Sequence, residues 1–413
     1  MSEASETTLT LADTQPTREA ALELLAAFLP HCGKCYQETR NFDLGTENRS
    51  NVSTLSPFIR SRLLSETEVA LAALNQFKDG SARKFIDEVF WRTYWKGYLE
   101  NRPQIWDRYR EDLATLRHRN LDSDTLDSAI NGTTGIRCFD YWTKELIETG
   151  YLHNHARMWF ASIWIFTLKL PWQLGADFFL RHLLDGDPAS NTLSWRWVAG
   201  LHTAGKSYLA TSSNIDRYTN GRFPVTAGLA AEAETIRDAW PELDAEHHSL
   251  AGPPQEIPPA SALLLLEEDL CDHCLPNCDF ASFMGVFPSE SYDEFSISPK
   301  VQNFRKEALK LRLQKLEKTK GVPIHSADTD LTNQVASWIS QNGLKHVYYS
   351  QPKVGFWSDQ WPNIHNAISD AGAEAHPFRL SFENRLFPHA TAGFFKFRKR
   401  LPALLSELQD EAD

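Results

Sequence analysis

The stretch HLLDGDPASNTLSWRW (residues 182–197) decides how the first half of the chain is interpreted. A turn with two aspartates, Asp185 and Asp187, leads into a segment that carries Asn191, Trp195 and Trp197. If that segment is a helix, residues 187, 191 and 195 lie four positions apart and share one face. Such a face is too polar for a simple core and too aromatic for a simple surface. It therefore indicates a face with a role beyond packing.

Length and composition set the outer limits. The chain has 413 residues, enough for two or three domains, with 42% hydrophobic and 23% charged residues. A formal net charge of −12 argues against broad non-specific coating of DNA, although it leaves room for a local basic face. We find no secretory signal and no apolar run long enough for a membrane span, so we expect a cytoplasmic protein without membrane contact.

The pattern along the chain predicts an α plus α/β organisation. An acidic N-terminal extension (1–34) precedes a helical domain (35–222), in which we expect helices over 85–99, 140–150, 153–170 and 176–187. A proline-rich linker (223–260) follows. Residues 261–413 alternate between short apolar strands and amphipathic helices, which predicts a smaller, Rossmann-like domain with a parallel sheet. Because this part has no G-x-G-x-x-G loop, dinucleotide binding there has little support.

Cysteine spacing leaves a metal site as a minor alternative. Cys32 and Cys35 form a C-x-x-C pair, and a second group, which also contains His273, consists of Cys271, Cys274 and Cys278. The two groups come from opposite parts of the chain, so a shared site would require its ends to meet. We favour reduced structural or incidental cysteines and expect no metal.

Three further constellations could bind a ligand. Ser53, Thr54, Leu55 and Ser56 precede a helix and would suit a phosphate, although an ordinary helix cap is the simpler interpretation. Glu88, Trp91 and Arg92 share a helix face that could hold a planar group, or could be an exposed ion pair beside a core indole. Asn154, Arg157 and Met158 form the third, in which a buried Arg157 would need Asp185 or Asp187 as its partner.

Taken together and in this order, these segments resemble the FAD-binding helical domain of the DNA photolyase/cryptochrome family. The D-G-D-x-x-x-N-x-x-x-W-x-W pattern at 185–197 matches without a gap. TGYLHNHARMWFAS (149–162) and FIDEVFWRTYW (85–95) are similar to two further family motifs, and the resemblance covers residues 35–200. It implies FAD as cofactor. The cofactor-binding residues that it implies are Ser53, Thr54, Leu55, Ser56, Phe85, Arg92, Arg157, Asp185, Asp187 and Asn191.

The resemblance also implies a role for individual side chains. Arg157 and Asp185 would pair beside the flavin, and Asn191 would face flavin N5, which favours a repair enzyme over a photoreceptor. Glu88, Trp91, Asn154, Met158 and Trp197 would receive a flipped-out pyrimidine dimer, whose large π-faces two indoles can clamp. Met158 in place of a histidine favours the cyclobutane dimer. Trp195 and Trp172 match two members of the family's electron-transfer chain.

Several departures from the family pattern stand beside this match. The usual third tryptophan has no counterpart: Arg119 falls near its position, and Trp106, Trp142 or Trp164 could substitute. Thr54 stands where many members have Arg, and His155 replaces an Arg associated with DNA. The segment after Trp197 differs. The α/β part comes last instead of first, and NRLFPHATAGFFKFRKRLP (384–402) looks like the closing motif of the family's antenna domain, which suggests a permuted or duplicated remnant.

The resemblance therefore implies a deoxyribodipyrimidine photolyase that splits cyclobutane pyrimidine dimers in DNA with light and reduced FAD, and we expect it to be a monomer. The residues do not indicate whether a second, antenna chromophore binds. The candidates for DNA contact are Arg102, Arg108, Arg110, Arg117, His118, Arg119, Arg196, Lys206, Arg217 and Arg222, with a second patch at Lys306, Lys310 and Lys315. The alternatives are a cryptochrome-like photoreceptor that signals to a protein partner, and a flavoprotein whose C-terminal domain does the recognition.

Overall fold

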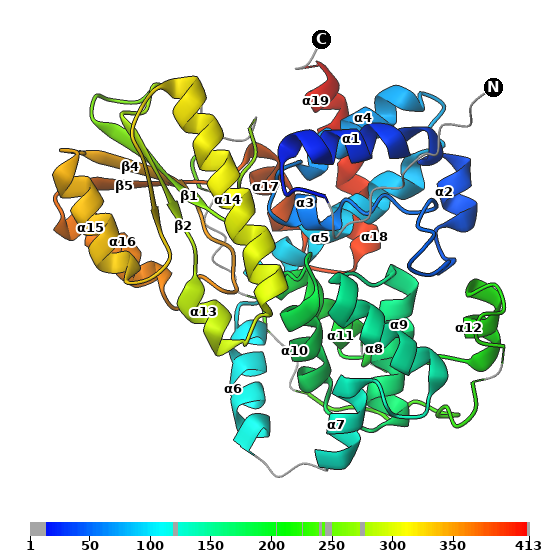
Figure 1. Ribbon diagram of the computed structural model, residues 1–413. Coiled ribbons are helices and arrows are strands. Elements are labelled where there is room, and N and C mark those ends of the chain that lie inside the picture. The colour runs from blue at the N-terminus through cyan, green and yellow to red at the C-terminus, as the bar shows by residue number, and fades with distance from the viewer. Residues whose placement is uncertain are drawn as a thin grey trace, which may run out of the picture.

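A computed structural model describes residues 14–118, 123–203, 205–224, 226–238, 242–243, 250–272 and 277–410. Helices make up the first part of the chain and a parallel sheet follows, as the sequence predicts (Figure 1). The helices of the first part are α1 Arg18–Phe28, α2 Lys34–Thr39, α3 Ser56–Arg60, α4 Glu66–Gln76, α5 Arg83–Glu100, α6 Gln104–His118, α7 Ser123–Asn131, α8 Arg137–Thr149, α9 Asn154–Ser162, α10 Trp172–His182, α11 Pro188–Val198 and α12 Ser212–Tyr218.

Helix boundaries follow local capping chemistry. Asp187 caps α11, its side chain accepting from Ser190 N, and Pro188 occupies the first turn, where no backbone donor is needed. Gly150 ends α8 in the left-handed conformation at φ 69°. The single helix expected over 153–170 is wrong in its second half: α9 ends at residue 162, and 163–167 form a π-helical turn. Pro171 then starts α10 four residues earlier than expected and does not simply end a helix.

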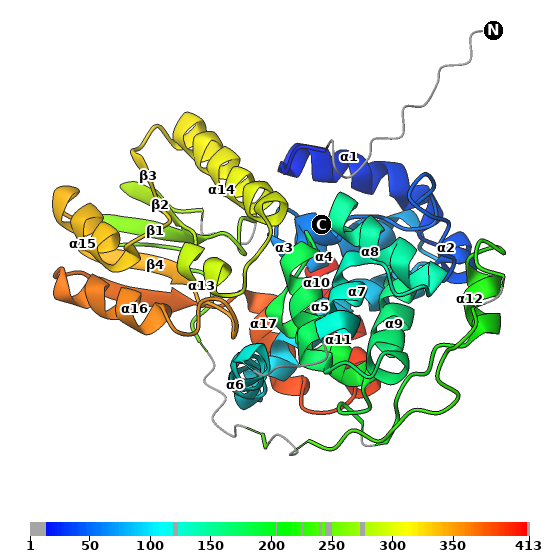
Figure 2. The ribbon, with the colours of Figure 1, turned by 60° about the horizontal axis from the view of Figure 1, so that its bottom comes forward.

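Five parallel strands form the sheet of the second part, in the order β3-β2-β1-β4-β5. The strands are β1 Ser261–Leu266, β2 Ser282–Val286, β3 Ile324–Ala327, β4 His346–Ser350 and β5 Glu374–Phe378, and the helices are α13 Ser289–Glu294, α14 Pro299–Lys320, α15 Leu331–Gln341 and α16 Trp361–Asp370. Leu263 and Leu265 face the core that includes α14, whereas Leu264 and Leu266 face α15 and α16. Helices therefore cover both faces, and in Figure 2 α14 lies on the side of the sheet next to the helical part.

The end of the chain returns from the sheet to the helical part. Helices α17 Ser381–Leu386 and α18 Phe394–Phe397 contact α5, and α19 Leu401–Asp410 contacts α4. Figure 1 shows these last helices, drawn in red, among the first helices, drawn in blue. We call residues 379–410 the C-terminal segment. The sheet thus begins at residue 261, where we expect the α/β domain to start, but the residues after 378 add no strand to the sheet.

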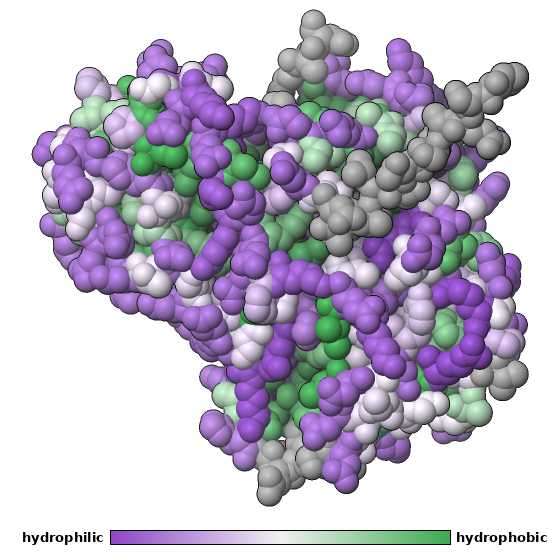
Figure 3. Space-filling model, viewed as in Figure 1, coloured by the Kyte–Doolittle hydropathy of each residue, from purple (hydrophilic) through white to green (hydrophobic). Residues whose placement is uncertain are grey.

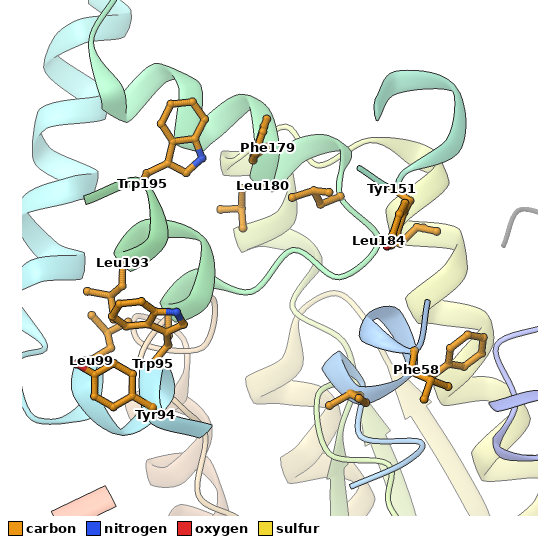
Figure 4. Packing of buried hydrophobic residues seen from close by; sticks show 14 of the residues in the cluster. Phe58, Tyr94, Trp95, Leu99, Tyr151, Phe179, Leu180, Leu184, Leu193 and Trp195 are labelled. Carbon is orange, nitrogen blue, oxygen red and sulfur yellow. The ribbon is translucent and has the colours of Figure 1, made fainter. Parts of the chain in front are cut away.

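Buried aromatic and aliphatic side chains join α5, α10 and α11. Figure 4 shows Leu193 pointing toward Trp95 and Leu99, while Trp195 lies beside Phe179 of α10. Different faces of α11 therefore make two contacts, one with α5 and one with α10. Hydrophilic side chains cover most of the face seen in Figure 3. Within the described ranges, no helix combines the length and apolarity needed to span a bilayer.

Candidate functional site

Two buried arginines hold the turn between α10 and α11. The carbonyl oxygen of Gly186 accepts from Arg305 Nη2 at 2.6 Å and from Arg60 Nε at 3.3 Å. Both guanidinium groups are almost fully buried, and Arg60 also pairs with Glu267 at 2.9 Å. The hydroxyl group of Tyr292 donates to the same Glu267 at 2.8 Å. Because Arg305, Glu267 and Tyr292 come from the second part of the chain, that part fixes the position of the turn.

Asp185 and Arg157 form an ion pair beside this turn. Arg157 Nη2 lies 3.0 Å from Asp185 Oδ2, and its Nε donates to Leu152 O at 2.8 Å. Burial alone would raise the pKa of the Asp185 carboxyl, but the charges of Arg157 and Arg92 outweigh burial and lower it below its ordinary value. The other carboxylate oxygen, Oδ1, is buried and without a hydrogen-bond partner. Asp185 therefore stays ionised with one acceptor position free.

Asp187 lies between a helix terminus and two cations. Its Oδ1 accepts from Ser190 N at 2.7 Å, while Oδ2 is 3.5 Å from Lys96 Nζ and 3.8 Å from Arg92 Nη1. Burial would raise the pKa of Asp187, yet Lys96 and Arg92 lower it well below the ordinary value. Lys96 Nζ also lies 3.8 Å from Glu268 of the α/β part. The carboxylate is thus held ionised by a network that spans both parts of the chain.

Asn191 and Trp195 both face α10. Asn191 Nδ2 donates to Ala176 O at 2.7 Å. This hydrogen bond fixes the orientation of the side-chain amide and leaves its oxygen for another hydrogen bond. Trp195 is 2% exposed, packs edge-on against Phe179 at 5.1 Å, and lies against Gly175. The face that contains residues 187, 191 and 195 is therefore an interface between two helices, with the buried Asp187 at the N-terminal end of α11.

The second matched tryptophan, Trp172, belongs to a short row of stacked rings. It stacks on Tyr109 with centroids 5.7 Å apart, and Tyr109 packs on Trp106 at 5.3 Å. Of the candidate substitutes for a third member, Trp164 meets Trp195 edge-on at 6.2 Å, and Trp142 stacks on Trp159 away from both. Trp106, Trp142 and Trp164 are each 0% exposed, so none is a surface terminus. Arg119 lies outside the described residues.

The loop expected to hold phosphates adopts a strained conformation. Thr54 has φ 51°, a region that residues with a Cβ rarely adopt. Ser53 Oγ accepts from Leu55 N at 3.5 Å, and Ser56 begins α3. Leu55 is fully buried, whereas Ser53, Thr54 and Ser56 keep partly exposed side chains. Three partly exposed residues with hydroxyl groups therefore lie close together at the start of α3.

Phe85 packs into the N-terminal aromatic cluster. Its ring lies 5.5 Å from Phe28 and 5.2 Å from Tyr36, and it is 3% exposed. Burial and the neighbouring Glu88 raise the pKa of Tyr36 well above its ordinary value, which keeps that phenol neutral. The N-terminal helix α1, expected as an extension, thus supports the residue that would contact a flavin.

Both indoles expected to clamp a lesion have aromatic neighbours in the structure. Phe394 of the C-terminal segment stacks on Trp91 with centroids 3.9 Å apart and planes 12° apart. Tyr208, in the altered segment after α11, stacks on Trp197 at 5.9 Å and 29°. Trp91 and Trp197 are both partly exposed. Each of the two indoles expected to clamp a lesion is therefore already stacked on an aromatic ring of this chain.

The polar members of the expected lesion site lie on α5 and α9. Glu88 Oε1 is 2.6 Å from Lys84 Nζ and 3.6 Å from Arg40 Nε. Asn154 is exposed at the first turn of α9, and Met158 is partly exposed one turn later. Glu88 is thus paired but not buried, and the two α9 side chains share one face.

Most cations expected to contact DNA are bound within the chain. Arg108 and Arg196 pair with Asp238, Arg110 with Glu294 and Asp359, Arg117 with Asp177, and Arg222 with Asp43, while Arg102 donates to Thr391 O. The second patch is also paired: Lys306 with Asp328, Lys310 with Glu307, and Lys315 with Glu19 and Asp272. His118, Lys206 and Arg217 are exposed. Composition and spacing alone could not distinguish these partnered cations from free ones.

His155, which replaces a DNA-associated arginine, also faces inward. Its ring lies 4.1 Å from that of Trp159, and its Nδ1 is 2.9 Å from Asn41 O. Burial lowers the pKa of His155, so the ring stays neutral near pH 7. It therefore supplies no positive charge to a phosphate.

Four of the described cysteines are separate thiols. Cys32, Cys35, Cys138 and Cys278 are free, and all but Cys35 are buried. Burial raises the pKa of Cys32 to about 11, which favours the unreactive thiol. Cys274 and His273 lie outside the described residues.

Three charged residues of the site were not found from the sequence. Lys96 follows Arg92 by four positions and so shares its helix face, a signal that could have identified it. Arg60 and Arg305 gave no such signal, because their partners come from distant parts of the chain. Arg305 in particular lies in a helix whose many basic residues indicate a solvated face, yet it is fully buried.

Comparisons with known proteins address the helical part. Residues 85–255 match the family model described as the FAD binding domain of DNA photolyase. The chain is 32% identical over 193 residues to a deoxyribodipyrimidine photo-lyase of Alkalihalophilus pseudofirmus and 35% over 194 residues to one of Streptomyces griseus. Each match covers 46% of this chain and 39% of the relative. A class III photolyase structure from Agrobacterium tumefaciens aligns with TM-score 0.43 and 26% identity, over 49% of this chain and 43% of that one.

Proposed function

We propose, from the similarity of residues 85–255 to the FAD binding domain of DNA photolyase and from the photo-lyases that this chain resembles, that the protein is a light-driven enzyme that repairs cyclobutane pyrimidine dimers in DNA. The observation that carries the proposal is the family match over residues 85–255, which contains every expected catalytic and lesion-binding side chain. The chain covers about two-fifths of the length of these relatives, so its activity as a whole is our inference.

The residues around the α10–α11 turn suit FAD. Asp185 Oδ1 and Arg92 Nη1 are buried without hydrogen-bond partners, and so is Ser190 Oγ. Buried polar atoms of this kind cost free energy unless a bound group satisfies them. Asp185 and Asp187 would hold the cofactor's polar groups, with Asn191 facing its reactive edge. When bound, FAD would supply the light-driven electron transfer that splits the dimer.

The protein would contribute charge and position. Arg92, Lys96 and Arg157 place three positive charges around Asp185 and Asp187, which favours an electron-rich cofactor over a neutral one. The paired Glu88 would hydrogen-bond the polar edge of the dimer, with Trp91 and Trp197 against its faces. Met158 in place of histidine supports the cyclobutane class. We propose a monomer and leave a second chromophore unassigned.

A photoreceptor is the second candidate, because aromatic rings already contact both lesion-clamping indoles. Phe394 on Trp91 and Tyr208 on Trp197 would have to move or share the site if a dimer enters. A cryptochrome-like protein that signals to a partner has no such requirement.

One experiment separates the two. The purified protein, with flavin bound and reduced, is illuminated with an oligonucleotide that carries one thymine dimer, and thymine absorbance is followed. We expect recovery of absorbance, and Trp197→Ala should slow it. Full flavin occupancy without any recovery would leave the photoreceptor as the better proposal, and absence of flavin absorbance would overturn both.

A further inference from the structure

One surface of the C-terminal segment differs in composition from the rest of the molecule. Residues 394–410 run as nearly continuous helix, in which Phe394, Phe397 and Leu401 are buried. The exposed side chains are at 395, 396, 399 and 400, which lie one, four and five positions after the first of them. They therefore share the helix face opposite the buried residues. We call this face, made of Phe395, Lys396, Lys399 and Arg400, the basic aromatic face.

Phe395 is exposed to an unusual degree. It is 74% exposed, more than any other large hydrophobic side chain in the described part of the chain, of which the next, Leu243, is 50% exposed. An exposed phenylalanine contributes no burial to folding, whereas Phe394 and Phe397 on either side are buried. An aromatic ring that protrudes between cations fits a partner with its own π-faces and negative charge.

The three cations of this face are free. Within the described residues, the side chains of Lys396, Lys399 and Arg400 make no hydrogen bond or ion pair, in a chain of net charge −12. The adjacent Arg398, by contrast, lies 3.1 Å from Asp87 and is bound to α5. Most arginines that seemed suited to DNA are paired in the same way. Unpaired positive charge next to the expected site is therefore concentrated here.

The face lies next to the helix that carries the expected lesion site. Phe394 stacks on Trp91 of α5. Three residues further along α5, Tyr94 donates its hydroxyl hydrogen to Ala392 O at 2.8 Å. Asn101 at the end of α5 donates to Phe387 O at 3.0 Å. Ring stacking and hydrogen bonds thus fix the C-terminal segment on α5, with Phe395 beside the ring that covers Trp91.

We propose that the basic aromatic face is a DNA-binding surface: Lys396, Lys399 and Arg400 contact phosphates beside the damaged base pair, and Phe395 stacks on an exposed base. This proposal rests on the proposed function, because it assumes that damaged DNA approaches α5. It adds a surface contributed by the end of the chain, outside the region that matches the family model.

Binding in the dark tests the surface without any photochemistry. Fluorescence anisotropy measures the Kd for a duplex that carries one thymine dimer, at several salt concentrations. For the triple variant Lys396→Ala, Lys399→Ala and Arg400→Ala we expect the slope of log Kd against log salt to fall by about 2 to 3, since each lost phosphate contact removes about 0.9. Phe395→Ala should keep the slope and weaken binding by about 5- to 150-fold.

The matched control neutralises three exposed lysines of the α/β part, in Lys318→Ala, Lys320→Ala and Lys345→Ala. We expect this control to keep the wild-type slope. A triple variant that binds like the control would overturn the DNA surface and would favour a protein partner for Phe395.

Repair of a dimer-containing dinucleotide supplies the second readout, because that substrate is too short to reach the face. The triple variant should repair it as wild type does while losing repair of the long oligonucleotide at moderate salt. An equal loss on both substrates would assign the segment to folding of the site and would overturn the proposal. Failure of wild type to bind flavin or to repair would sink the proposed function, yet the dark binding comparison would still decide the surface.

Discussion

The indole of Trp195 lies directly on the backbone of Gly175. A Cβ atom built at residue 175 would be 2.3 Å from Trp195 Cη2 and 2.5 Å from Cζ3. Real atoms do not approach so closely, so α10 and α11 are in contact only because residue 175 has no side chain. The same contact sets the distance between Asn191 and Ala176 O, and with it the depth of the proposed cofactor site.

Gly175→Ala should destabilise the protein. In a helix interior this change alone would favour folding by about 1 kcal/mol. The overlap with Trp195 should outweigh that gain and give a net loss of roughly 1–3 kcal/mol. Urea unfolding monitored by tryptophan fluorescence measures it. Gly252→Ala is the control, because the added methyl group meets only Ser381 Oγ at 4.0 Å. Equal stability of the two variants would contradict the close contact.

Arg305→Met should loosen the turn at residues 185–187. The side chain is fully buried, and its loss leaves the Gly186 carbonyl and the Tyr292 hydroxyl short of a partner. Loss of one member of a buried ionic network costs roughly 3 kcal/mol. The free energy of unfolding checks this, with the exposed Lys310→Met on the same helix as control. A loss no greater than that of the control would show that Arg60 alone holds the turn.

The sequence predicted the fold because periodicity and capping are local signals. Asp187 with Pro188 marked the start of α11, and Gly150 the end of α8. The error at 153–170 has a clear cause: the apolar run continues through a π-helical turn and on to Lys169, which adopts φ 54°, and hydropathy does not register that break.

The candidate site was only partly predictable for a different reason. Arg157 and Asp185 could be paired from the sequence, because a buried guanidinium needs a carboxylate and the family pattern supplies one. Arg60, Glu267 and Arg305 meet only after the α/β part docks on the helices. Phe394 meets Trp91 through the return of the chain end. Contacts of such large separation leave no mark in local spacing.

Glu145 should make a contribution to stability that is lost as pH rises from 5 to 7.5. Burial, with help from Asp43, raises the pKa of this carboxyl to about 7 against the opposing effect of Arg49. The folded state therefore binds a proton that the unfolded state releases near pH 4.5, so the group's contribution is lost as pH rises toward 7. Glu145→Gln should remove a pH dependence of up to roughly 3 kcal/mol. Urea unfolding at both pH values checks this, and an unchanged pH dependence in the variant would exclude Glu145 as its source.

Two routes could carry electrons to the proposed flavin. One runs between Trp195 and Trp164, which meet edge-on at 6.2 Å, whereas the family pattern indicates Trp172, which continues through Tyr109 to Trp106. Stacked rings couple better than a single edge contact. Trp172→Phe should therefore slow photoreduction of the bound flavin by at least about tenfold, whereas Trp164→Phe should change it by less than about twofold. Trp142→Phe is the control, since that indole donates to Asp43 and stacks on Trp159. Time-resolved flavin absorbance measures all three, and the reverse order of effects would assign the route to Trp164.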